Sequence, residues 1–135
     1  MYLNPLSYMW MARMPSAETV IEEALQEAQE RGLRIVRGPC SVWGPGDVLE
    51  AVDWCGAVLV KMGKTEKGFP EGWLREFCRY LGKDLYWFRN FNYGFSQLRA
   101  IEVYSVDRET KGRVYSTDRV SAQAAALSKK WCPVQ

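Results

Sequence analysis

The sequence predicts one α+β domain over residues 1–135, with about four helices and a small antiparallel β-hairpin near the C-terminus. Apolar residues recur at helical spacing in several segments, whereas two short stretches after residue 99 are typical of strands and are joined by a polar turn. With 135 residues, 47% of them apolar, the chain is long enough to bury a core without metals or disulfides.

The first helix is predicted over residues 17–31. Ser16 precedes it as an N-cap residue, and apolar side chains at positions 20, 21, 24, 25 and 28 share one face. Gly32 is expected to end it, because glycine tolerates the left-handed conformation found at many helix ends.

A short strand is predicted over residues 33–37, which are partly β-branched. The Gly38-Pro39 pair interrupts it, and residues up to Gly46 are predicted to form a loop. Phosphate binding is not expected in this loop, because the lysine and serine of a P-loop and the glycine spacing of a dinucleotide site are missing.

Residues 48–62 are predicted to form a second helix. Asp47 and Glu50 have the spacing of a capping box, and apolar residues follow at helical intervals. Gly56 inside this helix costs about 1 kcal/mol relative to alanine. The alternative is that Gly56 ends the helix and residues 57–62 form a buried strand, parallel to residues 33–37.

Two further helices are predicted on either side of Gly82. Pro70 suits a first helical position, and Asp84 can cap a helix that ends near Gly94. The inward faces are expected to hold Leu74, Phe77, Cys78 and Leu81 in the first helix and Leu85, Phe88 and Phe91 in the second. The aromatic content of residues 85–95 also allows a strand.

The C-terminal hairpin is predicted from residues 100–106 and 113–116, and a last helix from residues 119–131. Lys129 and Lys130 would stabilise the negative end of that helix. Residues 1–15, which contain four methionines and three aromatic residues, are predicted to be a flexible or interface segment.

The four cysteines are predicted to be mostly buried free thiols. Cys40, Cys55, Cys78 and Cys132 lie 15, 23 and 54 positions apart, without the close spacing of metal knuckles or redox dithiols. No metal and no cofactor is therefore expected. A signal peptide and an apolar membrane span are not recognised either, so we expect a cytoplasmic protein without a membrane partner.

Composition argues against common catalytic machinery. The chain has no histidine, which removes histidine triads and histidine-ligated zinc. Residues 61–99 hold eight basic against four acidic residues, whereas residues 1–60 hold four against eight. This polarity can orient a charged partner.

The predicted function is therefore that of a small regulatory or interaction protein, such as an inhibitor, adaptor or accessory factor, rather than an enzyme. Residues 73–95 contain more rings than the predicted helix faces can bury, and basic residues lie among them. The expected binding surface for another protein consists of Trp73, Arg79, Lys83, Tyr86, Trp87, Arg89, Asn90 and Tyr93.

Two alternatives stay open. Residues 70–93 have the rhythm of a helix-turn-helix, in which the second helix would read DNA bases while Arg75, Arg79 and Lys83 contact phosphates, in a dimer. A small enzyme would use the loop thiol of Cys40, or the carboxylates of Asp47, Glu50 and Asp53.

Overall fold

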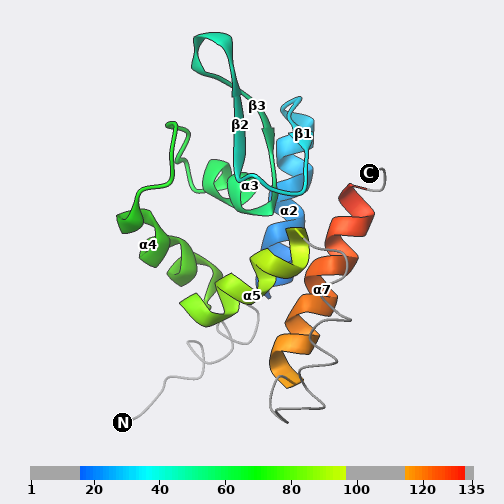
Figure 1. Cartoon of the computed structure of the whole chain (residues 1–135). Coiled ribbons are helices and arrows are strands. Elements are labelled where there is room, and N and C mark those ends of the chain that lie inside the picture. The colour runs from blue at the N-terminus through cyan, green and yellow to red at the C-terminus, as the bar shows by residue number, and fades with distance from the viewer. Residues whose placement is uncertain (1–15, 97–114, 133–135) are drawn as a thin grey trace, which may run out of the picture.

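Five α-helices and a three-stranded sheet form the part of the chain that the structure, a computed structural model, describes: residues 16–96 and 115–132, with the backbone alone for residues 115–119 (Figure 1). The elements are α2 Ala17–Glu30, β1 Arg34–Ile35, β2 Ser41–Gly44, β3 Val48–Val52, α3 Trp54–Lys61, α4 Glu71–Leu81, α5 Leu85–Ser96 and α7 Tyr115–Trp131. The α+β class is confirmed. Within the described residues, however, the strands lie in the middle of the chain, and the helices number five rather than four.

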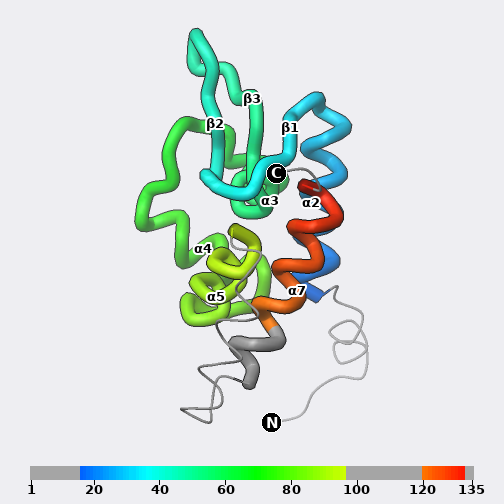
Figure 2. Tube along the Cα trace, turned by 45° about the vertical axis from the view of Figure 1, so that its right-hand side comes forward, coloured from blue at the N-terminus to red at the C-terminus, as the bar shows by residue number. Residues whose placement is uncertain are grey.

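The sheet is mixed, with strand order β1-β3-β2. β3 pairs in parallel with β1 and antiparallel with β2, and Ser41 stands opposite Val52. The β2–β3 hairpin extends away from the helices (Figures 1 and 2). Its turn contains Gly46 and Asp47, which both have positive φ angles, 72° and 57°.

The predicted helix over residues 48–62 is wrong in its first half. Asp47 lies in the hairpin turn, and residues 48–52 are β3, because pairing with two neighbouring strands overrides the local capping-box pattern. The N-cap is Asp53, whose Oδ1 accepts hydrogen bonds from the backbone N–H groups of Cys55 (2.8 Å) and Gly56 (3.1 Å). The alternative strand over residues 57–62 is also wrong, since α3 continues to Lys61.

Gly56 does not end a helix but allows a close approach of two backbones. A Cβ atom there would lie 2.1 Å from the carbonyl oxygen of Cys40. Only glycine lets α3 pack directly against the residue that precedes β2. The predicted loop over residues 38–46 is corrected accordingly, because Ser41–Gly44 form β2.

The other predicted helices are confirmed. Ser16 caps α2, and its Oγ accepts a hydrogen bond from the backbone N–H of Thr19 at 3.2 Å. Residues 85–95 are helical rather than extended, and Asp84 Oδ1 accepts from the Trp87 N–H at 2.9 Å. Pro70 is the N-cap of α4 rather than its first helical residue.

Trp54 lies at the centre of the core. It is fully buried, and its ring centroid lies 5.0 to 6.0 Å from those of four other aromatic residues, Phe77, Trp87, Phe88 and Phe91. Its indole Nε1 donates a hydrogen bond to Asn92 Oδ1 at 3.1 Å. This one side chain therefore joins α3 to α4 and α5.

Helices α5 and α7 lie side by side (Figures 1 and 2). Their close approach depends on small residues, since a Cβ at Gly94 would lie 2.9 Å from Ser121 Cα and 3.1 Å from Ala124 Cβ. α7 begins at Tyr115, so residues 115 and 116 are not part of a strand. The rest of the predicted hairpin, and residues 1–15, lie outside the described residues. Among the helices described, none has both the length and the apolar content needed to cross a bilayer.

Candidate functional site

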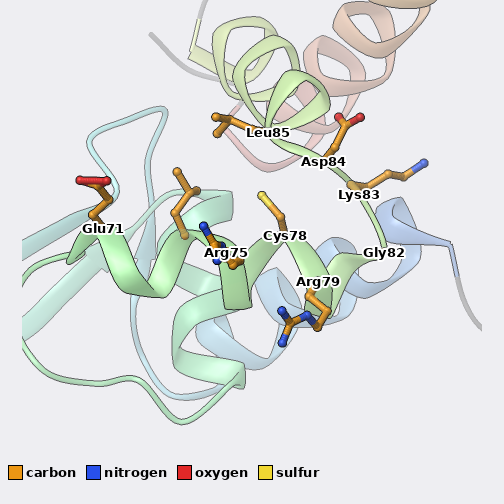
Figure 3. Close-up of a pocket in the computed structure, with 9 residues that line it drawn as sticks. Glu71, Arg75, Cys78, Arg79, Gly82, Lys83, Asp84 and Leu85 are labelled. Carbon is orange, nitrogen blue, oxygen red and sulfur yellow. The ribbon is translucent and has the colours of Figure 1, made fainter.

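The candidate site is a groove of about 590 Å³ between α4 and α5, which we call the α4–α5 groove (Figure 3). Leu74 and Cys78 of α4 and Leu85 of α5 supply its apolar lining. Figure 3 shows the Cys78 thiol directed toward the helix that carries Leu85. Its charged lining comes from Glu71, Arg75, Arg79, Lys83 and Asp84.

A tight turn at Gly82 connects the two helices that line the groove. Gly82 ends α4 with φ at 68°, and Lys83 N–H donates to the Cys78 carbonyl oxygen at 2.9 Å. This is the hydrogen-bond pattern of a glycine C-cap. Asp84 then starts α5 within two residues, so the connection is short and its position is fixed by caps on both sides.

The charge around the groove is mainly positive. Among the described residues, Arg75, Arg79 and Arg89 form no ion pair, whereas the nearby Glu76 is paired with Lys64 at 3.1 Å. Lys83 lies with its Nζ 5.7 Å from the ring centroid of Trp87. Of these three arginines, Arg75 and Arg79 line the groove, and with Lys83 they are available to an acidic partner.

The Cys78 thiol is an apolar part of the lining rather than a nucleophile. Burial, and to a smaller extent the Asp84 carboxylate, raise the pKa of Cys78 above its ordinary value. The thiol therefore stays protonated at neutral pH.

Two other hollows meet the groove at Gly82 and Lys83. One, of about 470 Å³, lies toward α7 and is lined by Tyr86, Trp87 and Asn90 among others. The second, of about 400 Å³, lies toward the first turn of α2. Lys83 borders all three, so its charge can act on a ligand in any of them.

The structure brings some of the predicted binding residues to the surface and buries one of them. Tyr86 and Tyr93 are 60% and 40% exposed, and Arg79, Lys83 and Arg89 are exposed as well. Trp73 and Asn90 are half-buried. The expectation that the Trp87 ring lies outside the core is wrong, because it stacks on Phe91 with centroids 4.7 Å apart.

The apolar residues that line the groove are predicted from the sequence to lie in the core. Leu85 was expected to point inward, yet it is 41% exposed and forms one wall of the groove. Leu74 is half-buried there. The available signal was the second apolar row of α4, Leu74 and Cys78, which lies beside the Phe77 and Leu81 row that packs on Trp54.

The carboxylates considered for catalysis do not converge. Asp47 forms an exposed ion pair with Lys67 at 3.3 Å in the hairpin turn. Glu50 is exposed, with its side chain beside Gly44 of the neighbouring strand. Asp53 is buried as the cap of α3. These three residues therefore do not form a shared acid–base site.

Comparisons with known proteins assign no family to the chain. No family model, no curated protein and no solved structure matches it. The α4–α5 groove and its charges are therefore the basis for a functional inference.

Proposed function

We propose that the chain is an interaction protein that binds an acidic, amphipathic segment of another protein in the α4–α5 groove. The observation that carries this proposal is the combination of an apolar lining with cations that have no ion-pair partner among the described residues. An apolar anchor entering such a groove gains free energy from burial, and carboxylates on its flanks gain from the surrounding cations.

The groove is large enough to hold the anchoring side chains of a peptide. Its volume of about 590 Å³ falls in the range of about 300–1,000 Å³ that is usual for small-molecule pockets. Leu85 and Tyr86 are adjacent exposed apolar residues at the start of α5. An amphipathic helix that lays its apolar face into a groove uses this kind of surface.

The same features favour a protein over a nucleic acid. The groove wall of leucine side chains offers no hydrogen bonds to phosphates, whereas it can hold an apolar side chain of a peptide. α5 carries Arg89 as its single basic residue, and Trp87 is turned into the core. A helix reading the major groove relies on a richer set of polar side chains.

Selection from a displayed library of random peptides on the wild-type chain tests the proposal. We expect the enriched peptides to combine leucine, isoleucine or phenylalanine with aspartate or glutamate. Fluorescence anisotropy of one enriched peptide should show at least tenfold weaker binding to Leu85→Asp and to Arg75→Glu/Lys83→Glu. Lys129→Glu, an exposed charge change at the far end of α7, is the matched control and should bind as the wild type does.

Titration of the same chain with a 20-base-pair DNA duplex tests the alternative, a DNA-binding function. Affinity that falls steeply with salt and is lost in Arg89→Ala would favour the DNA-binding function. Equal peptide binding by all the groove variants and the control would refute the groove as the binding site.

A further inference from the structure

A second cluster of reactive side chains lies where β2, β3 and α3 meet. The backbone N–H of Asp53 donates to the Cys40 carbonyl oxygen at 3.0 Å, which extends the β2–β3 pairing by one step. Cys55 follows two residues later in the first turn of α3. The two Sγ atoms and a carboxylate oxygen of Asp53 lie within 4.8 Å of one another.

The fold requires this proximity. Gly56 lets the first turn of α3 press against the backbone of Cys40, where any side chain would collide with the carbonyl oxygen. Asp53 is fixed by the two backbone hydrogen bonds that cap α3. Three chemically active groups, 15 residues apart at most, are therefore held together by strand pairing, a cap and a close glycine contact.

The two thiols differ in accessibility. Cys55 is 3% exposed, whereas Cys40 is half-buried and lines a surface hollow of about 300 Å³. Trp43, Lys67 and Phe69 line the same hollow. A substrate entering it reaches Cys40 first and has no direct path to Cys55, an arrangement in which one thiol attacks and the other resolves.

The electrostatics supply a proton acceptor. Burial raises the pKa of Asp53 to about 6, against the pull of the backbone hydrogen bonds that it accepts. Asp53 is therefore ionised at neutral pH, yet more basic than an exposed carboxylate. The hydrogen bond with the Cys40 thiol, followed by burial, raises the pKa of Cys55, so its proton must be removed before it can react.

Other ionisable groups face the cluster from neighbouring elements. Cys132, at the end of α7, has its pKa raised by burial, lowered by Arg37 and raised by Asp53. The Cys78 thiol of α4 also raises the pKa of Cys55, through a small electrostatic effect. Among these groups, Asp53 is the one whose pKa lies close to neutral pH.

We propose that Cys40 and Cys55 form a redox-active dithiol that reduces a disulfide substrate, with Asp53 accepting the proton of Cys55. The observations behind this proposal are separate from those behind the peptide-binding function proposed above. The Cys40 thiolate attacks one sulfur of R–S–S–R, forming a Cys40–S–S–R bond and releasing RS⁻, which takes the proton that Cys40 lost to solvent. Cys55 then passes its proton to Asp53 and attacks Cys40 Sγ.

The second attack forms the Cys40–Cys55 disulfide and releases the second RS⁻, which receives the proton held by Asp53. Two electrons and two protons move from the two cysteines to the substrate, which leaves as two thiols. The protein disulfide is reduced again when two molecules of a low-molecular-weight thiol reverse these steps.

Titration of the full chain with mixtures of reduced and oxidised glutathione tests the dithiol. After acid quenching and alkylation, intact mass and peptide mapping should show a reversible disulfide between Cys40 and Cys55. Cys40→Ser should abolish it, and Cys55→Ser should accumulate a mixed disulfide between glutathione and Cys40. Cys78→Ser, which removes another buried thiol, is the matched control and should form the disulfide as the wild type does.

Asp53→Asn keeps a good N-cap while removing the base, and circular dichroism checks that the variant folds. We expect the resolving step to slow by about 100-fold at pH 7, the size usual for loss of a general base. In the wild type the rate of the resolving step should rise between pH 5 and 7 as Asp53 ionises, and in Asp53→Asn this rise should be absent.

Two results would overturn the dithiol. One is independent alkylation of Cys40 and Cys55 at every glutathione ratio, without a disulfide between them. The other is stoichiometric binding of Zn²⁺ that protects both thiols until a chelator is added, because Cys and Asp are also zinc ligands.

Discussion

The contact between α5 and α7 leads to a sharp test of the fold, because it depends on the missing side chain of Gly94. A Cβ there would lie 2.9 Å from Ser121 Cα and 3.0 Å from the Ser121 carbonyl oxygen. Both are backbone atoms, so Gly94→Ala forces one helix away from the other instead of rotating a side chain. α5 also carries Leu85, so its position defines one wall of the α4–α5 groove.

The change in the free energy of unfolding caused by Gly94→Ala follows from two opposed effects. Overpacking of a close contact costs about 3 kcal/mol at the upper end of its usual range. Replacing glycine by alanine inside a helix gains about 1 kcal/mol. Gly94→Ala should therefore lower the free energy of unfolding by about 2 kcal/mol, which corresponds to a melting temperature about 8 °C lower for a chain of this length.

Gly72 provides the matched control. It lies in α4, and a Cβ there would meet nothing within 4 Å. Gly72→Ala should therefore raise stability by up to about 1 kcal/mol. Urea denaturation followed by tryptophan fluorescence measures both variants, with Trp54 and Trp87 as buried reporters. A Gly94→Ala variant as stable as the wild type, beside a stabilised Gly72→Ala, would refute the close contact of α5 and α7.

Three further predictions concern stability. The folded-state pKa of Asp53, about 6, exceeds its ordinary value of 3.8, so the folded chain binds more protons than the unfolded chain between these values. The stability advantage of the wild type over Asp53→Asn should accordingly fall by about 2 kcal/mol as pH rises from 4 to 7, measured by urea denaturation across that range; a constant difference would contradict the raised pKa. Trp54→Ala should cost about 4 kcal/mol, because it removes a fully buried ring and leaves Asn92 Oδ1 without its donor, whereas Tyr80→Ala, at a 43% exposed ring, should cost much less. Lys61→Met breaks the 2.7 Å ion pair with Glu27, which is partly exposed, so it should cost less than about 1 kcal/mol, and 1 M NaCl should reduce the difference in thermal unfolding.

The helices that sequence analysis predicted correctly are those whose signals are local. Ser16 and Gly32 bound α2, and Gly82 and Asp84 separate α4 from α5, through hydrogen bonds that span five positions or fewer along the chain. Such caps act wherever the helix lies in the fold. Their residues can therefore be recognised without knowledge of the neighbours.

Residues 41–53 were mispredicted because their structure is decided by distant partners. Val48, Ala51 and Val52 fit helical spacing, but pairing with β1 and β2 holds them in a strand. Gly56 is predicted to lie inside a helix as an unfavourable residue, or alternatively to end that helix, whereas its role is set by the carbonyl oxygen of Cys40, 16 positions earlier. The thiol pair was missed for the same reason, since no spacing rule relates Cys40 to Cys55 before the strands are paired.

The inward face of α5 is predicted only in part. Of the three residues expected to point inward, Phe91 is buried and Phe88 packs on Trp54, whereas Leu85 is exposed, and Trp87 and Phe95 are buried as well. α5 has two neighbours: Trp54 on one side draws in Trp87 and Phe91, and α7 on the other packs on Gly94. Because α5 packs against both neighbours, Leu85 is left on the exposed side of the helix, where it forms one wall of the groove.

Trp54 therefore connects the two proposed sites, the α4–α5 groove and the pair of thiols. Its ring packs on the α4 and α5 residues that lie behind the groove, and its backbone belongs to the turn of α3 that holds Asp53 and Cys55. Through this contact, oxidation of Cys40 and Cys55 should alter the affinity of the α4–α5 groove for peptide. Bound peptide should in turn shift, by the same factor, the glutathione ratio at which half of the Cys40–Cys55 pair is oxidised. Unequal shifts would show that one of the two measurements reports a different event, and no shift in either would show that the activities share a core without being coupled.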